Sequence, residues 1–79
     1  MARDSARWRV NPVDRRAHAV ALALPGLTVD EARTLVGLDS GLTLRTLPAG
    51  HHVAITAEHV VGRINVFERH GRVTNAFVG

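Results

Sequence analysis

The clearest regular pattern along the chain is an apolar stripe at helical spacing just after residue 28. Apolar residues recur there three or four positions apart with polar residues between them, which predicts an amphipathic helix over residues 29–38. The apolar positions are Val29, Ala32, Leu35 and Val36. Thr28 stands at the expected N-cap and Glu31 follows it by three residues, so the two are predicted to form a capping box.

Beyond this helix the period changes to two, which predicts strands. Apolar and polar residues alternate over residues 42–47 and 63–66, and Val73, Phe77 and Val78 indicate a final strand over residues 72–78. Residues 68–71 are predicted to form a hairpin-like turn. Residues 51–62 follow neither period, and so long a loop in a small domain is usually either functional or disordered. We therefore expect an α+β fold, with one helix packed on a small mixed β-sheet and a long exposed binding loop.

The first 25 residues are predicted to be an Arg-rich N-terminal arm, partly disordered, in front of a domain that spans residues 26–79. Asn11-Pro12 is expected to interrupt any regular element. Residues 14–24 fit two structures, a short Ala-rich helix or an extended strand that runs into the body of the domain. Pro25-Gly26 would end either one.

The positive charge of the chain is concentrated in this arm. Of the net charge of +3, residues 1–25 supply five arginines and two aspartates, whereas residues 26–79 hold five arginines and five acidic residues. The body is therefore neutral, and with two Phe, one Trp and no Tyr the whole chain offers little for bases to stack on. A nucleic-acid partner is not expected for the body, and only the arm could contact an anionic surface.

The residues that could carry catalysis or metal binding are few and poorly placed. Ser5 and Ser40 are the only serines, and neither lies in a strand-to-helix elbow. His51, His52 and His59 show no helical i, i+4 pairing, and the chain has no cysteine, so we interpret them as solvated loop residues. We expect no enzymatic activity, no metal and no cofactor.

The compartment is not fixed by the sequence. Two arginines precede an apolar stretch over residues 17–24, which weakly imitates a secretion signal, but the stretch contains His18 and is barely long enough. The absence of cysteine fits the cytosol, which we slightly favour. No stretch approaches the length of a membrane span.

Three segments of residues 26–79 together resemble one known family. Gly26-Leu27-Thr28-Val29-Asp30-Glu31-Ala32 is similar to that family's glycine and capped helix start, and Leu47-Pro48-Ala49-Gly50 to the "leucine-proline-valine-glycine" before its reactive loop. Arg63-Ile64-Asn65-Val66 resembles the "arginine-leucine-asparagine-valine" strand of its short bacterial relatives. The family is that of the potato type I serine-protease inhibitors, and the resemblance covers about two thirds of the chain.

The resemblance implies that the residues after Gly50 form a loop that a serine protease meets as a substrate. Two registers compete within it. Counting forward from Gly50 places Ile55 at the primary specificity position, whereas counting back from Arg63 places Ala57 there. We favour Ala57, because this register matches Ile55-Thr56-Ala57-Glu58 to the family's "valine-threonine-x-acid" pattern.

In this register the protease-contact loop runs over Ile55, Thr56, Ala57, Glu58 and His59. A loop without a disulfide must be held by side chains. We expect Arg63 to donate hydrogen bonds to Glu58, and Asn65 to donate to the loop backbone or to Thr56.

The resemblance also implies a partner. Ala57 is small, so the expected partner is a serine protease with a small primary pocket, elastase-like or subtilisin-like, bound by a monomer of this chain. The alternative is a non-inhibitory protein-interaction module on the same fold.

Overall fold

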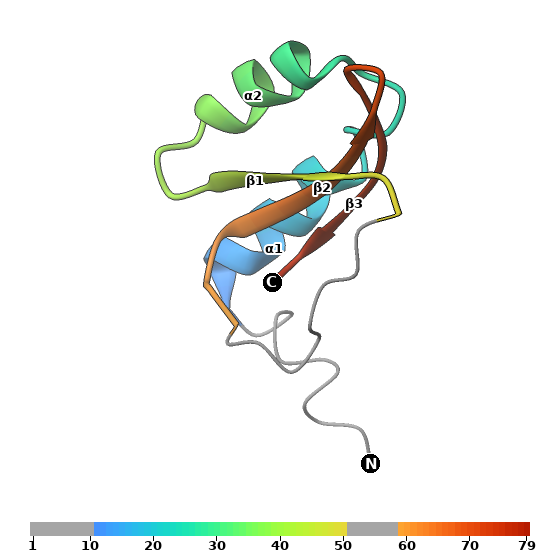
Figure 1. Cartoon of the computed structure of the whole chain (residues 1–79). Coiled ribbons are helices and arrows are strands. Elements are labelled where there is room, and N and C mark those ends of the chain that lie inside the picture. The colour runs from blue at the N-terminus through green and yellow to red at the C-terminus, as the bar shows by residue number, and fades with distance from the viewer. Residues whose placement is uncertain (1–10, 51–58) are drawn as a thin grey trace.

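In the computed structural model, residues 11–50 and 59–79 are described, and they form two helices and a three-stranded sheet (Figure 1). In chain order the elements are α1 (Pro12–Ala21), α2 (Val29–Gly37), β1 (Thr43–Pro48), β2 (Arg63–Arg69) and β3 (Arg72–Val78). The predicted α+β class with a small mixed sheet is confirmed. The sheet carries two helices where one was expected, and α1 corresponds to the helix left open as one alternative for residues 14–24.

Helix α1 begins where the sequence suggested an interruption. The side-chain oxygen of Asn11, the N-cap, accepts hydrogen bonds from the backbone N–H groups of Val13 at 2.8 Å and Asp14 at 3.3 Å. Pro12 occupies the first turn, where its fixed φ suits the helix and its missing N–H has no partner to lose. The predicted interruption at Asn11-Pro12 coincides with the boundary at which α1 begins, because the same pair is a good helix start.

The buried side of α1 is made of alanines. Ala17 and Ala21, one turn apart, are 0% and 4% exposed, and Leu24 beyond the helix end is also fully buried. Small side chains let the helix axis approach the sheet closely, whereas the larger Leu22 is 72% exposed. Of the two structures considered for residues 14–24, the helix forms and the strand does not. The hydrophobic core therefore begins well before the expected domain boundary at residue 26.

Helix α2 has the start that the sequence predicted. The Glu31 backbone N–H donates to the Thr28 hydroxyl at 3.1 Å, and the Thr28 backbone N–H donates to the Glu31 carboxylate at 2.8 Å. The hydrogen bond from the Thr28 backbone N–H to the carboxylate holds the pKa of Glu31 below its ordinary value. The capping box satisfies two backbone donors that would otherwise lack partners at this helix end.

The sheet has the strand order β1-β2-β3, with a parallel pair followed by an antiparallel one. In the parallel pair Thr43 lies opposite Arg63 and Pro48 lies opposite Glu68. Strands β2 and β3 are joined by a two-residue turn, His70-Gly71, in which both residues have positive φ. This is the conformation that the tightest hairpins require, and the predicted turn is confirmed as its last two residues.

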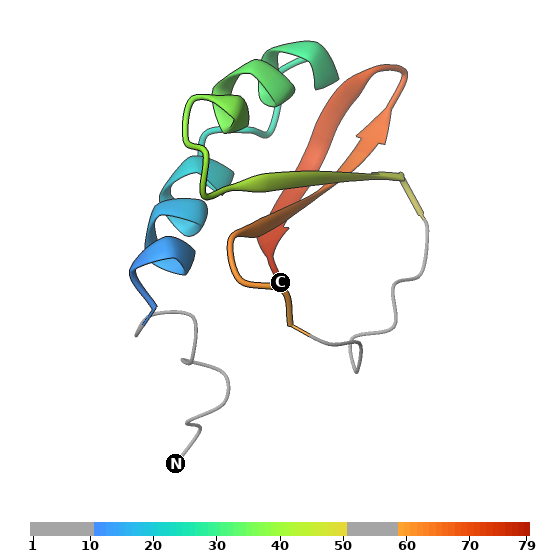
Figure 2. The same cartoon turned by 90° about the vertical axis from the view of Figure 1, so that its left-hand side faces the viewer.

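Both helices cover the same side of the sheet, and the core lies between the two layers (Figure 2). The buried apolar side chains come from every element and from the segments just before the strands. They are Ala17, Ala21, Leu24, Ala32, Val36, Leu42, Ile64, Val66 and Val73. Within residues 11–50 and 59–79 no helix combines the length and apolar character needed to cross a membrane.

An ion pair joins α1 to the turn between α2 and β1. The Arg16 guanidinium donates from Nε to the Asp39 carboxylate at 2.6 Å, and the same carboxylate accepts the Gly41 backbone N–H at 2.9 Å. These two hydrogen bonds lower the pKa of Asp39, and the carboxylate raises that of Arg16. Because both side chains contact solvent, the pair contributes little to stability.

Candidate functional site

The candidate site is the connection between the two parallel strands, residues 49–62. Because β1 and β2 run in the same direction, this connection leaves the sheet beyond Pro48 and rejoins it at Arg63, beside the start of β1. The predicted contact residues Ile55, Thr56, Ala57 and Glu58 lie outside the described residues. The site can therefore be built from the two ends of the connection and from the side chains that hold them.

The first end of the connection is tied to the sheet by the backbone. The Ala49 N–H donates to the Glu68 carbonyl at 2.7 Å, which continues the pairing one residue past β1. Gly50 then has a φ of 84°. A side chain would strain that conformation, so the glycine directs the chain away from the sheet at this point.

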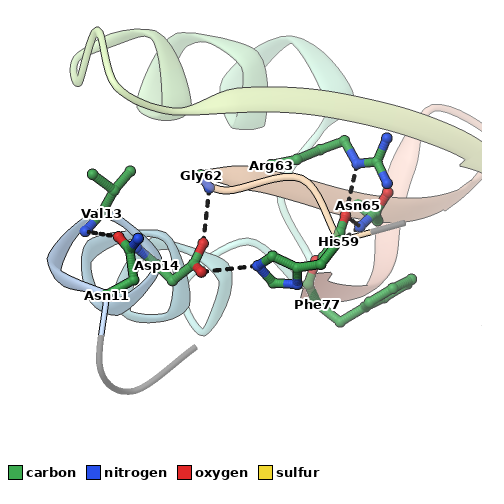
Figure 3. A network of polar contacts seen from close by, with 9 residues as sticks. Asn11, Val13, Asp14, His59, Gly62, Arg63, Asn65 and Phe77 are labelled. Carbon is green, nitrogen blue, oxygen red and sulfur yellow. Dashed lines mark hydrogen bonds and ion pairs between the residues drawn. The ribbon is translucent and has the colours of Figure 1, made fainter. Parts of the chain in front are cut away.

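The second end of the connection is held by a buried carboxylate from α1. Asp14 is only 2% exposed, and one of its oxygens accepts the Gly62 backbone N–H at 2.8 Å. The other oxygen lies 2.9 Å from Nε2 of His59, whose side chain is 42% exposed. Figure 3 shows Asp14 pointing from α1 toward both partners. One carboxylate therefore fixes two points on the last four residues of the connection.

Gly62 is required at this end for two reasons. Its φ is 77°, in the left-handed region that residues with a side chain rarely adopt. A Cβ built on it would also collide with the backbone carbonyl oxygen of Gly41 and lie 2.9 Å from a methyl carbon of Val13. The close approach also allows a hydrogen bond, in which the Gly62 carbonyl accepts the Thr43 N–H at 2.9 Å. The end of the connection is thus packed tightly against the start of β1.

The first residues of β2 form a second polar cluster on the sheet face opposite the helices. Asn65 is fully buried, its side-chain oxygen accepts from Arg45 Nε at 2.6 Å, and its amide donates to the Gly79 backbone oxygen at 2.8 Å. Arg63 Nε donates to the same Gly79 oxygen at 2.6 Å. No buried side-chain nitrogen or oxygen of the described residues lacks a hydrogen-bond partner. The cluster is therefore fully satisfied, and a satisfied buried network fixes its members rigidly.

The two clusters meet beside the His59 ring. Its Nδ1 lies 4.0 Å from the position a Cβ would take on Gly79, the residue that binds both Arg63 and Asn65. Figure 3 places the α1 cluster and the β2 cluster on either side of this ring. The structure therefore brings three predicted site residues, His59, Arg63 and Asn65, to one end of the sheet.

The predicted contacts of Arg63 with Glu58 and of Asn65 with Thr56 lie outside the described residues. Sequence reasoning missed three partners of these side chains, Asp14, Arg45 and Gly79. Arg45 carried a weak signal, since it alternates with apolar residues on a strand. Asp14 carried none, because an acid in the first turn of a helix is common and usually solvated.

In the described part of the chain, no group of three or more His, Cys, Asp or Glu side chains is placed to hold a metal ion.

Comparisons of this chain with family models, curated proteins and solved structures found no match.

Proposed function

We propose that this chain inhibits a serine protease by presenting the β1–β2 connection to the protease cleft as a rigid, substrate-like loop. The observation that carries the proposal is the cluster of Arg63 and Asn65 on the strand directly after the connection. Both side chains are fixed by hydrogen bonds to Gly79, and Asn65 is fully buried although it lies on the sheet face opposite the helices. Such a cluster is a firm base for a loop that must not collapse or adapt.

The proposed mechanism depends on what happens after the protease attacks. Ala57 occupies the primary pocket, Thr56 and Glu58 flank it, and the catalytic serine attacks the carbonyl of Ala57. The peptide bond after Ala57 breaks, an acyl-enzyme forms, and the amine of Glu58 is the leaving group. If Glu58 and the residues after it stay in place, this amine re-forms the peptide bond faster than water hydrolyses the acyl-enzyme.

Rigidity also accounts for affinity. A loop that is already extended loses little conformational entropy on binding, so an interface of ordinary size binds tightly. The satisfied cluster around Asn65 and the closely packed Gly62 both favour such pre-organisation. The small side chain of Ala57 favours an elastase-like or subtilisin-like protease.

The first test is a titration of elastase and of subtilisin with the purified chain. The proposal predicts stoichiometric loss of activity against at least one of them, with slow cleavage mapped by mass spectrometry to the bond after Ala57. Slow cleavage after Ile55 would support inhibition in the other register. Rapid, complete cleavage or no effect on either protease would refute the proposal and favour the non-inhibitory interaction module.

The second test separates the base of the loop from the scaffold. Arg63→Ala removes the hydrogen bond to Gly79, so the variant is expected to be cleaved faster and to inhibit more weakly while it remains folded. Arg33→Ala is the matched control, because it removes an exposed arginine from α2, an element outside the β1–β2 connection. Equal inhibition by the two variants would contradict the role assigned to Arg63.

A further inference from the structure

The side chain of Asp14 does not cap its own helix. The start of α1 is already capped by Asn11, which accepts the N–H groups of Val13 and Asp14. In α2 the acid at the equivalent third position, Glu31, bonds back to the N-cap, as a capping box requires. Asp14 instead turns away from its helix and binds two residues that are 45 and 48 positions away in sequence.

A buried carboxylate is costly unless its oxygens are well paired. Within residues 11–50 and 59–79, the oxygens of Asp14 are paired with the Gly62 N–H and the His59 ring. This makes the position of residues 59–62 relative to α1 sharply defined, because displacement of either partner leaves an under-paired buried charge. The chain closes further on itself there, since the Arg63 N–H donates to the Val60 carbonyl at 3.1 Å.

The helix that carries Asp14 is itself firmly placed. Ala17 and Ala21 pack it into the core, and Val13 contacts the region of Gly62 from the same first turn. The carboxylate is therefore mounted on a rigid element rather than on a flexible surface side chain.

We propose that Asp14 of α1 is a positioning residue for the inhibitory loop, holding His59 and Gly62 so that the end of the connection stays in place. This inference rests on the proposed function and deepens it, because the amine released by cleavage lies on the segment that leads directly into His59. With Asp14 in place, His59 and Gly62 are held against α1, and religation is favoured. Without Asp14, the same chain is cleaved as a substrate although its strands and core are intact.

The test compares Asp14→Asn with Arg16→Gln. Both variants remove one charged anchoring contact of α1, but Arg16 holds the turn before β1 through Asp39, whereas Asp14 holds the end of the connection. The first probe is thermolysin, a zinc protease on which serine-protease inhibition has no bearing. Cleavage of the connection is followed by mass spectrometry, and circular dichroism verifies that each variant is folded.

We expect thermolysin to cleave the connection of Asp14→Asn about tenfold faster than that of the wild type, as the loss of a buried charged hydrogen-bond acceptor implies, and that of Arg16→Gln within about twofold. Exchange of the Gly62 amide proton should accelerate in Asp14→Asn alone. Equal cleavage rates and equal Gly62 exchange in the two variants would overturn the inference.

A second variant covers the case in which Asp14→Asn does not fold. His59→Gln changes a partly exposed side chain outside the core and replaces the imidazole ring that contacts Asp14. We expect a threefold or greater rise in thermolysin cleavage, by the same reasoning on a weaker contact. An unchanged rate in a folded His59→Gln would count against the inference.

The serine-protease titration of the same variants separates this inference from the proposed function. If the wild type inhibits and Asp14→Asn inhibits equally well and is cut equally slowly, the positioning role is wrong and the inhibitor function stands. If the wild type does not inhibit but thermolysin and amide exchange still single out Asp14→Asn, the anchor is real and the inhibitor function is wrong.

Discussion

Helices α1 and α2 lie on the same side of the sheet, yet they begin in different ways. The start of α2 is satisfied locally, because Thr28 and Glu31 bond to each other within four residues. Among the described residues, Asn11 caps the start of α1 locally, while the acid Asp14 binds residues 45 and 48 positions further along the chain. The capping box stabilises α2 itself. The long-range contacts of Asp14 instead fix the position of His59 and Gly62 relative to α1.

The largest expected difference between the two regions is in the free energy of unfolding after a glycine in each is replaced by alanine. Gly62→Ala places a Cβ against the Gly41 carbonyl and forces a positive φ on alanine, so we expect a loss of about 2–4 kcal/mol in the free energy of unfolding. Gly37→Ala at the end of α2 meets nothing within 4 Å and should be neutral or stabilise by about 0.5–1 kcal/mol. Urea denaturation measures both, and a Gly62→Ala loss no larger than 0.5 kcal/mol, about the scatter of ordinary surface substitutions, would show that the close approach is not tight.

The next comparison removes the two polar contacts themselves. Asp14→Ala leaves the Gly62 N–H and the His59 ring without their buried acceptor, and should cost about 2–4 kcal/mol. Thr28→Ala removes one member of a capping box and should cost about 1 kcal/mol. The two variants should also change the NMR chemical shifts of different residues. The changes should reach His59 and Gly62 in Asp14→Ala, and should stay around the start of α2 in Thr28→Ala. The comparison fails if the two losses are equal.

The smallest expected effect is the loss of stability when the pH is lowered. The pKa values of Glu31 and Asp39 are both lowered in the folded protein, so each contributes stability that is complete above the unfolded-state values near 4 and is lost as the pH falls through the lower folded ones. The denaturation midpoint should therefore fall modestly below about pH 4.5. Glu31→Gln should remove the part of this pH-dependent stability that comes from the start of α2. Arg16→Gln should reduce the part that comes from Asp39. A midpoint that rises on acidification would contradict both assignments.

The elements that could be predicted are those whose signals are local. The capping box at Thr28, the period-two strands and the turn that ends in His70-Gly71 each depend on residues close in sequence, and each is present. The start of α1 was also local, but an Asn-Pro pair fits a turn as well as an N-cap, and the buried alanines lack the large apolar stripe that marks a helix.

The rest of the site could not be predicted, because its partners are distant in sequence. Nothing near Asp14 indicates that its carboxylate will bind the backbone of Gly62, and nothing near Asn65 indicates that Gly79 will accept from it. Long-range polar contacts of this kind depend on the assembled fold. Arg63, Asn65 and His59 were predicted as site residues from a family resemblance, which did not indicate the partners that they have in the structure.

The most direct test of inhibition by a held loop is religation. The chain is cut once in its connection by a catalytic amount of the inhibited protease at low pH, purified, and returned to the same protease at neutral pH. If both sides of the break stay in place, the intact chain re-forms to a measurable fraction and the same intact-to-cut ratio is reached from either starting material. A cut chain that stays cut, or an intact chain that is consumed completely, would contradict the account.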